Sequence, residues 1–98
     1  MKLAALLCAV VFPAHADYIS GTLGGDYVRI SEQACPADIL SMVSEDIHDR
    51  LHAAEVRISG TVWRACWAVT PDGTVHILFE DGDSGKLPVG QFRKVTTL

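Results

Sequence analysis

The stretch EVRISGTVWRACWAV, residues 55–69, has the clearest β-strand pattern of this 98-residue chain. Apolar side chains recur at every second position through most of it, which is the period of a β-strand. Gly60 interrupts the alternation and predicts a bulge or bend. Beyond it the side chains divide between two strand faces, Trp63, Ala65, Trp67 and Val69 on one and Arg64, Cys66 and Ala68 on the other. The stretch therefore predicts the longest strand of an antiparallel sheet.

Two further strands are predicted after this one. Val75, Ile77 and Phe79 share one face of the next strand, and residues 87–95 form the last strand, where Pro88 favours an edge position. Turn-forming residues at 71–73 and 81–85 separate these strands and favour tight connections. The pattern predicts a three-stranded antiparallel meander.

The residues before position 35 carry weaker signals of secondary structure. Residues 27–30 alternate weakly and are a candidate fourth strand, Tyr27-Val28-Arg29-Ile30. Residues 17–26 are rich in glycine, serine and threonine, which is typical of a flexible lead-in or a loose edge strand.

A helix is predicted from Pro36 to Ala53. Proline suits the first helical position, and Asp38 places an acid in the first turn. Apolar residues then recur at spacings of three and four, which gives one apolar stripe: Leu40, Val43, Ile47 and Leu51. The predicted fold class is α+β, with one amphipathic helix packed on a small twisted antiparallel sheet of three to four strands.

Residues 1–16 have the pattern of a secretory signal peptide. Lys2 precedes ten apolar residues, and Ala14 and Ala16 are the small residues of a cleavage site. A membrane span needs about 20 apolar residues, so we expect no span once the signal is removed. Because Lys2 leaves with the signal, the net charge changes from −4 to −5 in the single exported domain 17–98. The expected location is the periplasm or the outside of the cell.

The exported domain keeps two cysteines, Cys35 and Cys66. An even number of cysteines in an oxidising compartment favours a disulfide, and no C-x-x-C spacing indicates a redox site. The bridge would close a loop of about 32 residues, which stabilises a chain by roughly 3–4 kcal/mol. We therefore expect a structural disulfide between the start of the helix and the longest strand.

Two constellations resemble metal sites. His48 and His52 are four residues apart, the spacing of zinc-peptidase helices, but Asp49 stands where the general-base glutamate would be. Glu80, Asp81 and Asp83 supply fewer oxygens than the about six of a full calcium loop. The interpretations that we favour are a polar helix face and a solvated acidic turn. We expect no metal, no cofactor and no catalytic residues, and keep an enzyme with His48 and His52 as ligands as a third option.

Charge and aromatic residues indicate the kind of partner. An acidic chain argues against nucleic acid, whose binding proteins carry basic surfaces. Trp63 and Trp67 share one strand face, where one is expected in the core and the other is a candidate for lining a groove. The candidate binding residues are Trp63, Arg64, Trp67, Glu80, Asp81 and Asp83.

Some of these residues carry a resemblance. Trp63-Arg64-Ala65, Val75, Phe79, Asp81-Gly82-Asp83 and Leu87 resemble the pattern of Tudor and SH3-like small barrels. The resemblance implies a sheet that curls towards an SH3-like barrel. Tudor domains place a cage aromatic before the hairpin glycine, where this chain has Asp81.

A second resemblance concerns the whole layout. Ala65-Cys66-Trp67, Glu80-Asp81-Gly82-Asp83, Pro88 and Phe92 are similar to the arrangement in small uncharacterised exported proteins of proteobacteria and their prophages. This resemblance implies the compartment of the protein, but it does not indicate an activity.

The function expected from these observations is a non-catalytic, exported module that binds another protein or a component of the cell envelope. The alternative is a periplasmic inhibitor, an immunity protein or a phage superinfection-exclusion protein that blocks an envelope enzyme or channel. Its negative charge would suit a basic target.

Overall fold

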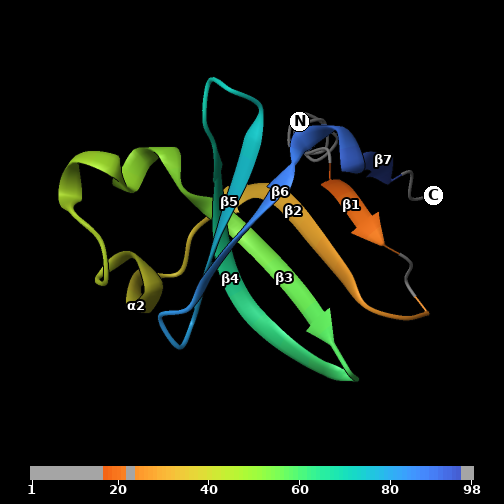
Figure 1. The fold of residues 1–98 in the computed structure, drawn as a ribbon. Helices are drawn as coiled ribbons and strands as arrows, with labels where there is room; N and C mark the ends of the chain where they lie inside the picture. Colours follow the sequence, from red (N-terminus) through yellow and green to blue (C-terminus); the bar gives the residue numbers. More distant parts are fainter. Residues whose placement is uncertain (1–16, 22–23, 96–98) are drawn as a thin grey trace, which may run out of the picture.

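The computed structural model describes residues 17–21 and 24–95, and its ribbon is a curled sheet with one irregular segment outside it (Figure 1). The predicted signal peptide, residues 1–16, lies outside the described residues. The sheet is antiparallel and its strands are β1 (Asp17–Gly21), β2 (Tyr27–Ala34), β3 (His52–Ile58), β4 (Thr61–Val69), β5 (Thr74–Phe79), β6 (Ser84–Pro88) and β7 (Arg93–Val95). Their spatial order is β6-β5-β4-β3-β2-β1-β7.

The alternating stretch 55–69 is two strands and not one. Ile58 pairs with Thr61, so that only Ser59 and Gly60 connect β3 to β4. Both have positive φ angles, 52° and 84°, as a type I′ hairpin turn requires. The Asp26 carboxylate accepts a hydrogen bond of 2.9 Å from the Ser59 backbone N–H. Gly60 therefore belongs to a hairpin turn that reverses the chain, and the prediction of a bulge or bend within one strand is wrong.

The connection between β6 and β7 shows how strongly the sheet curls. These strands are consecutive in the chain yet lie at opposite edges of the seven-stranded sheet. A flat sheet would separate them by about 29 Å at the usual strand spacing, whereas the five steps from Pro88 to Arg93 reach at most about 18 Å. The sheet must therefore curve. It forms an open half-barrel, since β6 and β7 do not pair with each other in the described residues. The SH3-like barrel towards which we expected the sheet to curl is thus not reached.

The two faces of β4 enter different cores. Its odd-numbered side chains face the concave side, where a first cluster contains Ile30, Val56, Ala65, Val75 and Ile77. Its even-numbered side chains face the outside, where a second cluster contains Cys35, Ile39, Leu51 and Cys66. Ala65 and Cys66 are both fully buried. The strand predicted to be the longest is thus also the one covered on both sides.

The predicted helix Pro36 to Ala53 is wrong. The segment contains one helical turn, α2 (Ala37–Leu40), then the 3₁₀ turn η1 (Glu45–Arg50), and β3 begins at His52. Ser44 between them is extended, with ψ 143°, and its hydroxyl donates to the Asp46 carboxylate. Serine and aspartate make such local bonds at the expense of a helix.

The apolar stripe nevertheless faces the core. Its members, Leu40, Val43, Ile47 and Leu51, all belong to or pack on the outer cluster, where Leu51 is buried and the others are half-buried. The spacing therefore identified the inward face but not the backbone that presents it. The fold class is mostly β, not α+β. No helix in the described ranges reaches seven residues, and none of them is long and apolar enough to cross a membrane.

The remaining strand predictions fared better. Residues 17–21 pair with β2, so this part of the lead-in is a strand. The predicted strand 27–30 exists and extends to Ala34. The last predicted strand is divided by the 3₁₀ turn η2 (Val89–Gln91) into β6 and β7. Pro88 ends the edge strand β6, as its missing N–H led us to expect.

The disulfide is confirmed. Cys35 and Cys66 are bonded, with their Cα atoms 5.5 Å apart. The bridge ties the beginning of the irregular segment to the centre of β4, so it holds the cover of the outer cluster in place.

Loss of the disulfide should lower the free energy of unfolding by roughly 3–4 kcal/mol, because the unfolded chain regains the entropy of its closed loop. The measurement is urea unfolding of the domain in oxidised and reduced form, with Cys35→Ala/Cys66→Ala as the permanently reduced form. Coinciding unfolding curves would show that the bridge does not hold the outer cluster.

Candidate functional site

A hollow lies at one end of the concave face, and we call it the tip hollow. It has a volume of about 350 Å³ and is lined by Ile58, Thr61, Trp63, Phe79, Asp81, Asp83 and Ser84. Trp63 comes from β4 and Phe79 from the end of β5, while the two aspartates come from the turn between β5 and β6. The hollow therefore combines aromatic walls with two carboxylates.

The turn that carries the aspartates is fixed by its own backbone. The Phe79 N–H donates to the Asp83 carbonyl at 2.8 Å, and the Gly82 N–H donates to the Phe79 carbonyl at 2.9 Å. Gly82 has a φ of 94°, which favours glycine at this position. Asp81 accepts a hydrogen bond of 3.0 Å from the Asp83 N–H. Neither aspartate takes part in an ion pair with the residues described, and both are exposed.

A second depression, which we call the barrel groove, adjoins the tip hollow and shares Ile58 and Phe79 with it. Its volume is about 360 Å³. Its walls come from both sides of the open half-barrel: Ser20, Gly21, Asp26, Tyr27, Val28, Val56, Arg57, Ile58, Ile77, Phe79, Gly85, Lys86 and Leu87. Most of the wall is apolar, so the concave face offers a continuous surface for another molecule.

Gly85 contributes to the groove by having no side chain. It lies opposite Ile77 in the ladder and therefore faces the concave side. A Cβ atom at this position would meet no heavy atom within 4 Å. The space beside β6 is thus open where any other residue would begin to fill it.

The two tryptophans have different surroundings. Trp63 lines the tip hollow. Trp67 donates its indole N–H to the Ser31 carbonyl at 2.7 Å and lies 5.9 Å from the His52 ring. Both are half-buried and pack on the concave cluster. Trp67 thus connects β4 to β2, while Trp63 is the one that faces a hollow.

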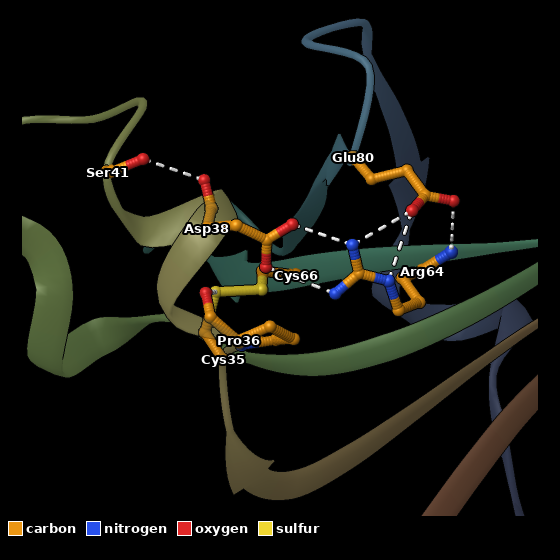
Figure 2. A network of polar contacts seen from close by, with 7 residues as sticks. All are labelled: Cys35, Pro36, Asp38, Ser41, Arg64, Cys66 and Glu80. Atoms are coloured by element: carbon orange, nitrogen blue, oxygen red, sulfur yellow. Dashed lines mark hydrogen bonds and ion pairs between the residues drawn. A yellow bond between two sulfur atoms is a disulfide. The ribbon is translucent and has the colours of Figure 1, made fainter.

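Arg64 and Glu80 lie on the opposite face in an ion network with Asp38 (Figure 2). Arg64 Nη2 lies 2.6 Å from Asp38 Oδ2 and 3.0 Å from Glu80 Oε1. The Arg64 backbone N–H also donates to Glu80 Oε2 at 3.2 Å. The network joins α2 to β4 and the end of β5, close to the disulfide. Its two members among our six candidates therefore do not belong to the tip hollow.

The network also shifts the pKa values of Asp38 and Arg64. Hydrogen bonds from the Arg64 guanidinium hold the pKa of the Asp38 carboxyl below its ordinary value of 3.8. The same bonds, to Asp38 first and to Glu80 second, raise the pKa of Arg64.

The histidine pair does not form the predicted arrangement. His48 is in η1, where its Nε2 lies 3.0 Å from the Val43 carbonyl oxygen, whereas His52 is the first residue of β3. The helix that was to align them is absent. Within residues 17–21 and 24–95 no group of three His, Cys, Asp or Glu side chains could hold a metal ion.

The sequence reasoning missed Ile58, Phe79 and Gly85 as parts of the site. Phe79 shares a strand face with Val75 and Ile77, as predicted. The neighbouring hairpin and the curl that bring Ile58 beside it were not predicted. Gly85 was interpreted as a turn residue, since it closes the glycine-rich run 81–85.

Comparisons with protein-family models, with curated proteins and with solved structures found no match. The argument for function therefore depends on the geometry above.

Replacing Arg64 by glutamine should lower the thermal unfolding midpoint at pH 7, because Asp38 and Glu80 lose their shared cation. The pKa of Asp38 is depressed in the folded protein, so its contribution is present above about pH 3.8 and disappears as the pH falls through the lower folded value. The difference between wild type and Arg64→Gln should therefore shrink below pH 3.8. Arg57→Gln is the matched control, since Arg57 forms no ion pair with the described residues. An unchanged difference between pH 7 and pH 2 would contradict this role of Asp38.

Proposed function

We propose that the protein is exported and acts as a non-catalytic binding module, with a basic region of another protein as its ligand. The observation that carries the proposal is the tip hollow, in which Asp81 and Asp83 stand beside the aromatic walls of Trp63 and Phe79. A cationic side chain is attracted both by carboxylates and by the faces of aromatic rings. An apolar neighbour of that cation would find the barrel groove adjacent.

The global charge supports the same class of ligand. Residues 17–98 have a net charge of −5, since Lys2 is the only charged residue among 1–16. Charge of one sign increases the rate of encounter with oppositely charged proteins. Among the sources of positive charge we favour a protein surface, because the adjoining groove is mostly apolar and has a volume of about 360 Å³.

The disulfide supports export. The disulfide Cys35–Cys66 is of a kind that persists in oxidising compartments. The similarity in layout to small exported proteins agrees with this location.

Inhibition of a basic envelope enzyme, an immunity function or phage exclusion is the alternative within this proposal. The acidic rim of the tip hollow favours a basic target in these cases as well. Inhibition differs from simple binding in that the target loses activity when it is captured.

Removing the two carboxylates of the tip hollow should abolish capture of the partner. The exported domain is immobilised, host periplasmic extract is passed over it, and retained proteins are identified by mass spectrometry. We expect wild type to retain a basic protein that Asp81→Asn/Asp83→Asn retains at least tenfold less. Glu45→Gln/Asp49→Asn is the matched control, because it removes two exposed carboxylates from η1.

Equal retention by both double variants, or retention of an acidic protein only, would contradict the proposal. If the retained protein is an envelope hydrolase, its activity with and without the domain separates inhibition from binding alone.

The exported protein should begin at Asp17, because small residues precede that position as signal peptidase requires. Intact mass measurement of the protein recovered from the periplasm or medium checks this. A mass that includes residues 1–16, found with the membrane or cytoplasm, would contradict export.

A further inference from the structure

The outermost strand on one side of the sheet, β6, has an open edge. It pairs with β5 on one side and with no described strand on the other (Figure 1). The Phe79 N–H donates to the Asp83 carbonyl and the Val89 N–H to the Gly73 carbonyl, both at 2.8 Å and in one register. Backbone groups alternate along an antiparallel ladder. The N–H and C=O groups of Ser84 and Lys86 therefore point away from β5.

These edge groups have no hydrogen-bond partner in the described part of the chain. An unpaired edge is a ready template for another strand, and natural proteins usually block it. Here Pro88 removes one donor at the end of β6, but Ser84 and Lys86 keep theirs. The open edge thus offers two donors and two acceptors in the spacing of a β-ladder.

The concave row of β6 indicates which side chains an added strand would bring. Gly85 and Leu87 are its members, and Asp83 in the preceding turn continues the row. Asp83 is a rim carboxylate of the tip hollow, Gly85 leaves its space unfilled, and Leu87 is part of the groove wall. A neighbouring strand would place a basic residue beside Asp83 and a large apolar residue beside Gly85, two positions apart.

We propose that an extended segment of the partner adds to β6 as a further strand, with a basic residue and a large apolar residue at alternate positions on its inward face. This proposal rests on the function proposed above and specifies its ligand. Main-chain hydrogen bonds to Ser84 and Lys86 provide affinity, while the tip hollow and the barrel groove provide specificity.

A second copy of the chain fits this edge less well. In the symmetric antiparallel pairing centred on Gly85, glycine would face glycine, and the groove would receive no side chain. Pairing centred on Lys86 would bring Leu87 beside Gly85, but it would set two lysines opposite each other and would leave Ser84 facing Pro88, which has no N–H. A segment of a different protein can supply the cationic group that the concave row lacks.

The test uses a synthetic peptide, acetyl-Thr-Val-Thr-Phe-Thr-Lys-Thr-amide, together with the peptide of reversed order for parallel addition. In the antiparallel arrangement phenylalanine lies beside Gly85 and lysine beside Asp83. Binding to the exported domain is measured by calorimetry and by the change in tryptophan fluorescence. We expect one of the two peptides to bind.

N-methylation separates strand addition from side-chain binding. Methyl groups on the two threonines that flank phenylalanine block the N–H groups that face β6, and should weaken the antiparallel peptide at least tenfold. Methyl groups on phenylalanine and lysine block N–H groups that face away, and should leave affinity within twofold. For the reversed peptide the two expectations are exchanged, because in a parallel pair the N–H groups that face β6 belong to the residues opposite Gly85 and Leu87. Methyl groups on its phenylalanine and valine should weaken binding at least tenfold, and those on the threonines that flank phenylalanine should not.

Protein variants test the groove. Gly85→Val starts to fill a space in which a Cβ atom meets no heavy atom within 4 Å, and it should weaken binding at least tenfold. Gly90→Val adds the same side chain on η2, where a Cβ atom also meets nothing within 4 Å, and it should not weaken binding. Circular dichroism melts verify that both variants fold.

Failure of both peptides to bind, or equal loss of affinity with either pair of methyl groups, would overturn strand addition. If the methyl groups have no effect while Asp81→Asn/Asp83→Asn still weakens binding, strand addition fails and the proposed function stands. If neither change matters, both fail. Dimerisation that Gly85→Val abolishes would make a second copy the occupant of the edge and overturn a heterologous partner.

Discussion

The bond between Cys35 and Cys66 is the constraint on which the rest of the structure depends. It joins the irregular segment between β2 and β3 to β4, the strand whose centre is covered on both faces. Burial of Ala65 and Cys66 on adjacent positions of β4 requires cover on both faces of the sheet. The concave side obtains its cover by curling, whereas the outer side has only one helical turn and one 3₁₀ turn, held by the bridge and by the Arg64 network.

The curl and the site have one origin. Ala65 at the centre of β4 is buried because the sheet bends around its concave face. The same bend leaves β6 and β7 as two edges that do not pair with each other in the described residues. A closed barrel would remove the edge and cover the groove. The open half-barrel leaves Gly85, the two aspartates of the tip hollow and the free backbone groups of β6 on one accessible side.

The sequence allowed the strands to be predicted better than the helix because the two periods differ in what they require. Alternation such as that of Trp63, Ala65 and Trp67 fits only an extended backbone with one buried face. The spacing of Leu40, Val43, Ile47 and Leu51 fits any backbone that turns the same side chains inward, and the extended Ser44 between α2 and η1 interrupts the helix. Ser44 followed by two acids is itself a helix-start signal, which could have divided the prediction. Three of six candidate site residues, Trp63, Asp81 and Asp83, meet in the tip hollow, while Arg64, Glu80 and Trp67 stabilise the fold. Which candidates line the hollow depends on the strand register and on the curl of the sheet, and neither can be predicted from a local sequence pattern.

Amide hydrogen exchange along β6, followed by NMR with and without the probe peptide, tests whether this edge is open in the free protein and pairs with an added strand. In the free protein the amides of Gly85 and Leu87, which face β5, should exchange slowly, and those of Ser84 and Lys86 should exchange quickly. With the peptide bound, Ser84 and Lys86 should become protected. Rapid exchange of both amides in a saturated complex, or their protection already in the free protein, would contradict an open edge that receives a strand.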